Sequence, residues 1–72
     1  MNRLKVAKHL TEQEYDRLLK THASHNRSMG LNEREKYTLE NIVKVKRGEK
    51  GNLHVHYDNG DWWHYTPAGN WY

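Results

Sequence analysis

The sequence predicts an α+β fold, in which an N-terminal amphipathic helix packs on a three- to four-stranded antiparallel β-meander. Two observations carry this prediction. A helix-capping signal opens a segment of helical periodicity, and later segments alternate polar with β-branched or aromatic residues between turns. The 72 residues suffice for a single domain, 1–72, with the helix at about 12–23 and the sheet at about 37–72. A chain this short buries only about 60% of its unfolded surface, which leaves little room for a deep cleft.

The helix is predicted to begin after Thr11. The Thr11 hydroxyl can accept a hydrogen bond from the backbone N–H of Glu14, and the Glu14 carboxylate can accept one from the backbone N–H of Thr11. Residues suited to burial then recur at spacings of three and four, which places them on one helical face. They are Tyr15, Leu18, Leu19, and His22 or Ala23.

The polar segment 24–30 predicts a loop, and a second capping pair follows it. Asn32 is predicted to cap a short helical turn near Glu33, with Glu35 as its partner. We expect the chain to change from helix to strand between residues 36 and 41. Strands are then predicted at 42–47, 52–57 and 61–66, with a last short strand at 70–72. Turns are predicted at 48–51 and, as a type I turn, at Thr66, Pro67, Ala68 and Gly69.

The loop at residues 58–60 decides which side chains share a face of the sheet. A two-residue turn would mix apolar and polar side chains on both faces. A three-residue loop with Gly60 in the left-handed conformation pairs Val55 with Trp63 and separates the faces. Burial favours this second register, because a slip of one residue moves every side chain to the other face. The apolar face then carries Leu53, Val55, Tyr57, Trp63 and Tyr65, and the outer face carries His54, His56, Trp62 and His64.

The strand at 42–47 adds positive charge to this outer face. Alternation is expected to turn Val43 and Val45 toward the helix, and Lys44 and Lys46 away from it. A cationic sheet face with an exposed indole can hold a phosphate backbone and stack an unpaired base. We therefore expect a small non-enzymatic binding module whose outer sheet face contacts nucleic acid, single-stranded or structured. The candidate nucleic-acid-binding residues are Lys44, Lys46, Arg47, His54, His56, Trp62 and His64; of these Arg47 is expected near the rim of the face, as is Lys50.

Other interpretations of the outer face stay open. Ordinary solvated strand residues give the same pattern. His54, His56 and His64 share one face and can offer three imidazoles to a zinc ion, although no buried carboxylate is placed to orient them. No metal is assigned on this basis. The histidines expected at a cap, in a loop or partly buried are His9, His22 and His25.

Protein binding is a third class of function that the sequence allows. The chain has no Phe, so every aromatic side chain carries a polar group, and Tyr and Trp are enriched at interfaces. The candidate contact residues are Trp62, Tyr72 and Tyr37. In size, charge and lack of motifs, the chain looks like the small accessory or inhibitor proteins that phages and other mobile elements encode. An exposed edge at residues 71–72 allows a monomer or a weak homodimer.

Charge and composition narrow the class of protein further. Lys and Arg outnumber Asp and Glu by 12 to 9, and this net charge of +3 suits an anionic partner and argues against an acidic mimic of nucleic acid. The sequence has neither a nucleophile–base motif nor a phosphate-binding loop, so we expect neither enzyme activity nor a cofactor. The lack of cysteine, and of an apolar segment of about 20 residues, predicts a cytoplasmic protein without membrane association.

Overall fold

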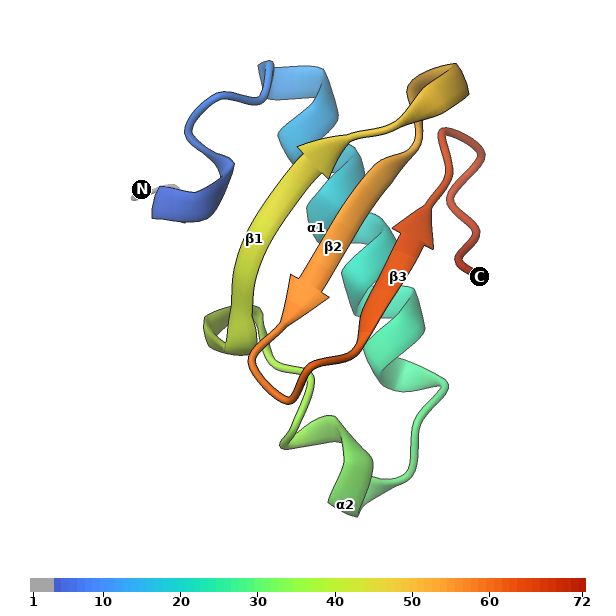
Figure 1. The fold of residues 1–72 in the computed structure, drawn as a ribbon. Helices are drawn as coiled ribbons and strands as arrows, with labels where there is room; N and C mark the ends of the chain where they lie inside the picture. The colour runs from blue at the N-terminus through green and yellow to red at the C-terminus, as the bar shows by residue number, and fades with distance from the viewer. Residues whose placement is uncertain (1–3) are drawn as a thin grey trace.

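The computed structural model describes residues 4–72 and has the predicted α+β class (Figure 1). One long helix packs against a three-stranded antiparallel sheet with the strand order β1-β2-β3. The helices are α1 (Glu12–Arg27) and α2 (Leu31–Arg34), and the strands are β1 (Ile42–Arg47), β2 (Leu53–Tyr57) and β3 (Trp62–Tyr65). Short 3₁₀ turns occupy Lys5–Ala7, Leu39–Asn41 and Glu49–Gly51. The sheet therefore begins at Ile42, later than the predicted residue 37.

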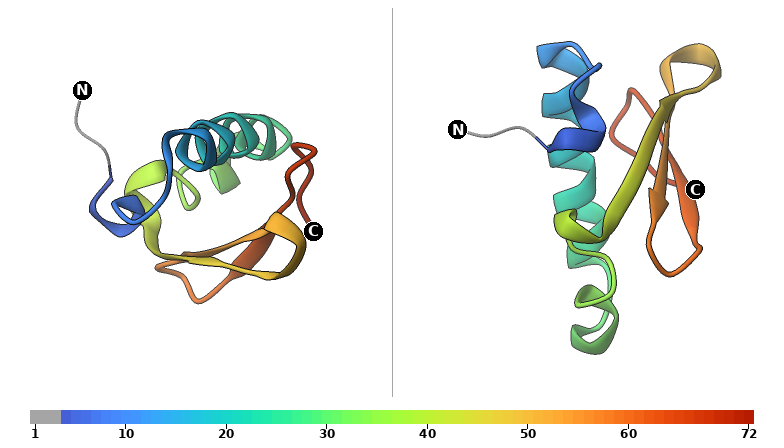
Figure 2. Two further views of the ribbon diagram at one scale, coloured as in Figure 1. Left: turned by 90° about the horizontal axis from the view of Figure 1, so that it is seen from above. Right: turned by 60° about the vertical axis from the view of Figure 1, so that its left-hand side comes forward.

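The molecule has two layers, with α1 on one side and the sheet on the other (Figure 2). The 3₁₀ turn at Lys5–Ala7 contacts β1, and the C-terminal segment runs beside β3. Both edge strands are therefore partly covered, which limits pairing with other chains. Within residues 4–72, no helix has the length and apolar composition that crossing a membrane requires.

Helix α1 begins where the sequence predicts and ends one turn later. Its capping box is complete: Glu14 N donates to Thr11 Oγ1 over 3.1 Å, and Thr11 N donates to Glu14 Oε1 over 2.8 Å. The predicted loop at 24–30 is wrong for residues 24–27, which form the last turn of α1. His25 is buried in that turn, so tertiary packing overrides the polar composition. The buried face of α1 is Leu18, Thr21, His22 and His25, and Ala23 is exposed.

The connection to the sheet uses a different cap from the predicted one. Asn32 lies inside α2, which has no side-chain cap, so the predicted cap is wrong. A capping box forms later, where Thr38 N donates to Asn41 Oδ1 over 3.0 Å. Asn41 Nδ2 also donates to Asp58 Oδ2 over 3.0 Å, and this bond ties the start of β1 to the β2–β3 loop.

The β2–β3 register is the favoured one. Leu53 pairs with Tyr65, His54 with His64, Val55 with Trp63 and His56 with Trp62. Gly60 has a φ of +91°, as the three-residue loop requires. The turn at residues 66–69 is confirmed by a hydrogen bond from Gly69 N to Thr66 O over 3.0 Å. The residues after it form only a single bridge, between Tyr65 and Trp71, so the sheet has three strands.

Strand β1 departs from simple alternation. Lys44 pairs with His56 and Lys46 with His54, as expected, but an irregularity between Ile42 and Lys44 turns Val43 outward. Val43 is 53% exposed, so its predicted position against the helix is wrong, and Ile42 is buried in its place.

The core lies between α1 and the inner face of the sheet. Trp63 packs against it at half burial, and the Tyr37 side chain, predicted as a contact residue, is buried within it. Its buried apolar residues are Ala7, Leu10, Leu18, Tyr37, Ile42, Val45, Leu53, Val55, Tyr57 and Tyr65.

Three buried side chains of this core form a chain of polar contacts, whereas the buried Nε1 of Trp63 has no hydrogen-bond partner among the described residues. The His25 Nδ1 atom lies 2.8 Å from Tyr65 Oη, which lies 2.6 Å from Tyr57 Oη. Burial raises the pKa of Tyr57 to about 12 and also raises that of Tyr65, so both hydroxyls stay protonated at neutral pH.

Candidate nucleic-acid interface

Five rings form a continuous group on the outer face of the sheet. We call this group the ring platform, and its members are His54, His56, Trp62, His64 and Tyr72. His56 stacks on Trp62, with ring centroids 5.4 Å apart and an interplanar angle of 11°. His64 stacks on Tyr72 at 4.3 Å and 5°. The two stacks meet between Trp62 and His64, whose centroids are 4.8 Å apart.

The local sequence explains why these rings come together. Side chains two residues apart in a strand share a face, so His54 and His56 project from β2 on the side where β3 places Trp62 and His64. Tyr72 joins them because the turn at 66–69 folds the chain back: His64 N donates to Tyr72 O over 2.8 Å, and Tyr72 N donates to His64 O over 3.0 Å.

Tyr72 is missing from the predicted nucleic-acid-binding set. The proline–glycine turn signals that the chain returns, but only the backbone pairing with His64 places the Tyr72 ring on the outer face. Asn52 Nδ2 then donates to Tyr72 Oη over 3.1 Å, which holds this ring in place.

The platform is half buried at its centre and open at two points. Trp62 is 48% exposed and Tyr72 is 62% exposed, whereas the three imidazoles are half-buried. Trp62 and Tyr72 line one surface hollow together with Asp61, and Tyr72 lines a second one with Glu49. The two hollows around Tyr72 thus each include an acidic residue: Asp61, which precedes β3, and Glu49, which lies in the connection between β1 and β2.

The β1 side of the same face is cationic. Lys44 and Lys46 lie opposite His56 and His54, and both side chains are exposed. Contact with the Lys46 ammonium lowers the pKa of Lys44. Neither lysine takes part in the ion pairs found between residues 4 and 72, which use Lys20, Lys36 and Arg47. Two neighbouring ammonium groups without a carboxylate partner favour an anionic ligand.

His56 contributes a neutral ring to the platform. Burial lowers its pKa, and the charges of Lys44, Lys46 and His54 lower it further. At neutral pH His56 therefore offers a stacking surface and a hydrogen-bonding nitrogen.

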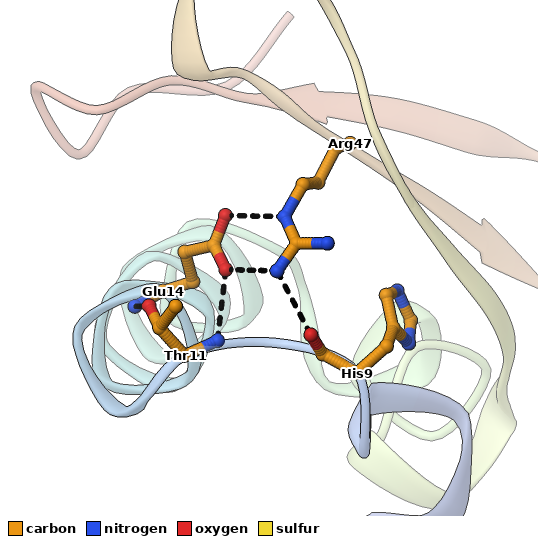
Figure 3. Close-up of polar contacts among 4 residues, drawn as sticks. All are labelled: His9, Thr11, Glu14 and Arg47. Atoms are coloured by element: carbon orange, nitrogen blue, oxygen red, sulfur yellow. Dashed lines mark hydrogen bonds and ion pairs between the residues drawn. The ribbon is translucent and has the colours of Figure 1, made fainter.

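Arg47 lies on the other side of the sheet, which corrects its predicted place near the rim of the outer face. Its Nε donates to Glu14 Oε2 over 2.8 Å, and its Nη2 donates to Glu14 Oε1 over 2.7 Å and to the His9 carbonyl over 2.8 Å (Figure 3). The hydrogen bonds from Arg47 and Thr11 lower the pKa of Glu14 to about 2. Arg47 thus joins the end of β1 to the start of α1.

The three outer histidines are not assembled as a metal-ligand set. His54 meets His64 edge to face with centroids 4.7 Å apart, but His56 lies flat against Trp62. Across the described part of the chain, no group of three or more His, Cys, Asp or Glu side chains is arranged to hold a metal ion. Ring stacking is the dominant arrangement of these histidines.

The outer face as a whole joins a strip of unpaired lysines on β1 to aromatic rings on β2, β3 and the C-terminal segment. Comparison with known proteins found no family model that matches this chain, and no curated protein or solved structure with significant similarity to it. The residues and geometry of the chain itself are the basis for inferring what it does.

Proposed function

We propose that the protein binds single-stranded nucleic acid through the outer face of its sheet. The observation that carries this proposal is the ring platform next to Lys44 and Lys46, which have no carboxylate partner within the described residues. Aromatic rings that stack bases, beside cations that follow the phosphate backbone, are the features that proteins use to bind single strands.

The exposed rings supply the surface for stacking. The indole of Trp62 stacks with His56 and lies beside His54 and His64, yet it remains 48% exposed, so a base can cover its open area. Tyr72 is open in the same way beside His64. Each stacked base is worth about 1–3 kcal/mol by alanine substitution, and every base has a face that can stack.

The distribution of charge determines how a bound nucleic-acid single strand is oriented across the outer face. Lys44 and Lys46 attract phosphates to the β1 side, whereas Asp61 and Glu49 repel them from the two hollows beside Tyr72. The backbone of the ligand is therefore expected to run over β1, with its bases turned toward Trp62 and Tyr72.

A single strand fits this face better than a duplex does. The rings lie on a sheet and can stack only with bases that are free of their own partners. The described chain places no long helix on the outer side that could enter a major groove, because α1 lies on the opposite layer (Figure 2). We place this activity in the cytoplasm, where a chain without cysteine is at no disadvantage.

The test is a titration of the protein with a short single-stranded oligonucleotide, followed by tryptophan fluorescence at about 50 mM and 200 mM salt. We expect quenching that saturates and weakens with salt. Trp62→Leu is expected to weaken binding about tenfold or more, because it removes the stacking ring. A Lys44→Gln/Lys46→Gln double variant is expected to lower the slope of log K against log salt by about 1.4.

The matched control is Lys20→Gln/Lys36→Gln, which removes the same charge from α1 and from the turn after α2, where both lysines already pair with carboxylates. It should keep nearly all of the affinity. Equal loss in the two double variants, or no salt-sensitive quenching of the wild-type protein, would contradict the proposal.

Binding of a protein partner is the second candidate function. It is favoured by the exposure of Trp62 and Tyr72, whose mixed apolar and polar character is enriched at interfaces. A protein recovered repeatedly from a lysate by the wild-type chain and lost with Trp62→Leu, in the absence of oligonucleotide binding, would favour this function over the first.

A further inference from the structure

A second concave site lies on the helix side of the sheet. It is a hollow of about 260 Å³ between the end of α1, the segment after it and the C-terminal segment. It shares no lining residue with the ring platform. Its volume lies just below the range of about 300–1,000 Å³ that is usual for drug-sized ligands, so it suits a small head group.

Aromatic rings form most of the wall of this hollow. Trp71 stacks on His25 with centroids 5.1 Å apart, and Trp63 meets the same imidazole edge to face at 4.5 Å. Tyr37 lies beyond His25, at a centroid distance of 6.4 Å. Trp and Tyr rings attract cations through the negative charge of their π faces, and they do so most strongly where water is partly excluded.

The charges around the hollow also favour a cation. Glu33 lines it with a side chain that is 55% exposed. The hydroxyl of Tyr37 donates to the Asp61 carboxylate, and this hydrogen bond is the main cause that raises the pKa of Tyr37, with a smaller contribution from the charge of Glu33. Burial lowers the pKa of His25 to about 4, so its imidazole is uncharged at neutral pH.

Two cations lie close by without lining the hollow. Arg34 donates to the carbonyls of Met29 and Arg27, and Lys36 Nζ lies 3.8 Å from a Glu33 oxygen. The Lys36 contact is a long, exposed ion pair, which a ligand cation can displace at little cost.

We propose that this hollow binds a methylated ammonium group, held by the rings of Trp63, Trp71 and Tyr37 and by the charge of Glu33. An unmethylated ammonium keeps a strong hydration shell that this apolar wall cannot replace, whereas methyl groups spread the charge and can make apolar contacts with the wall of the hollow. The proposal does not rest on nucleic-acid binding, because no member of the ring platform lines this hollow, although Trp63 lines both this hollow and the one beside Trp62 and Tyr72.

The test compares choline with its neutral isostere 3,3-dimethylbutan-1-ol, and the readout is the NMR signals of the three indole N–H groups. We expect choline to shift the Trp63 and Trp71 signals with a saturable, millimolar response and to leave Trp62 in place. The isostere has the same shape without the charge and is expected to bind at least about fivefold more weakly.

Substitutions of residues that line the hollow test the roles of Glu33 and Trp71. Glu33→Gln is expected to weaken choline binding about threefold or more, because it removes the one carboxylate in the lining. Glu35→Gln is the matched control, since Glu35 is exposed nearby and does not line the hollow, and it should bind choline as the wild type does. Trp71→Leu should abolish the response of Trp63.

The wild-type comparison decides the question even where Trp71→Leu fails to fold. Equal affinity for choline and the isostere, a choline response confined to Trp62, or no response at all would overturn the proposal. Phosphocholine and trimethyllysine, titrated in parallel, distinguish a lipid or free head group from a modified protein side chain. Tighter binding of either one than of its neutral analogue supports the site.

Discussion

Gly48 lies against the imidazole of His54, and this contact shapes one end of the ring platform. A Cβ atom at position 48 would lie 2.3 Å from His54 Nε2, far inside normal contact distance. The backbone of Gly48, with φ −106° and ψ −165°, is open to any residue, so the side-chain contact alone requires glycine here. The sequence shows only a glycine at a turn and gives no sign of this contact.

Gly48→Ala is therefore expected to displace the His54 ring and lower the free energy of unfolding by about 1 kcal/mol. Urea unfolding measures the stability, and the NMR signals of His54 and His64 report the displacement. Gly30→Ala is the control, because nothing lies within 4 Å of a Cβ at that position. In a Gly48→Ala/His54→Ala double variant, the cost of the alanine at position 48 should largely vanish. Strictly additive effects would show that the contact carries no energy.

At the scale of elements, two adjacent residues at the end of β1 serve opposite faces. Lys46 lies on the outer face opposite His54, whereas Arg47 pairs with Glu14 at the start of α1. A pattern of three basic residues in four positions predicts charge but does not predict which of the three finds a carboxylate. The bidentate pair holds the end of β1 against the first turn of α1 (Figure 3).

Arg47→Gln and Lys46→Gln should therefore have separate effects. Arg47→Gln is expected to lower the urea midpoint and leave oligonucleotide affinity nearly unchanged. Lys46→Gln is expected to lower oligonucleotide affinity and leave the urea midpoint nearly unchanged. The Glu14 pKa is lowered from 4.5 to about 2, so its pair stabilises the fold above pH 4.5 and this contribution is lost as the pH falls toward 2. Arg47→Gln should flatten the pH dependence of stability in that window. Loss of oligonucleotide binding in Arg47→Gln at full stability would contradict this assignment.

The start of helix α1 can be predicted from the sequence, but its end cannot. The capping box at Thr11 and Glu14 is a local signal, and it predicts the start of α1 correctly. The end of α1 depends on His25, which is polar in sequence and is buried against Trp63 and Trp71. Local patterns cannot predict this end, because the partners of His25 come from the far end of the chain.

The molecule as a whole folds around two buried histidines. His22 Nε2 donates to the Tyr37 carbonyl over 2.7 Å, and His25 Nδ1 lies 2.8 Å from Tyr65 Oη. Burial lowers the pKa of both, that of His25 from 6.5 to about 4. The native state therefore holds its two core histidines uncharged at neutral pH.

This arrangement predicts acid-sensitive stability. The unfolded chain takes up protons near pH 6.5 and the native His25 only near pH 4, so stability is full above pH 6.5 and falls as the pH drops through this interval. Between pH 7 and pH 5 we expect a loss of about 1–2 kcal/mol, with His22 and His56 acting in the same direction. His25→Phe keeps a ring without a titrating group and should reduce this loss. Urea unfolding at pH 7, 6 and 5 measures both proteins, and an equal loss in the two would exclude His25 as a source.

The sequence by itself determined the α+β class, the start of the helix, the three strands β1 to β3 and the β2–β3 register, but the strand predicted at 70–72 is only a single bridge. These features depend on caps, periodicity and turn residues, which act over a few neighbouring residues. Alternation along β2 and β3 was enough to place His54, His56, Trp62 and His64 on one face.

Only the tertiary structure decided where Arg47, Val43, Tyr37, His25 and Tyr72 lie. Each of these side chains is positioned by partners distant in the sequence, or by an irregular strand. The residues next to it in the sequence therefore do not predict its position. The outer face, with Lys44 and Lys46 beside the ring platform, was therefore predictable in outline. Its fifth ring, and the aromatic hollow on the opposite side, arise only when the C-terminal segment closes onto the sheet and the end of α1.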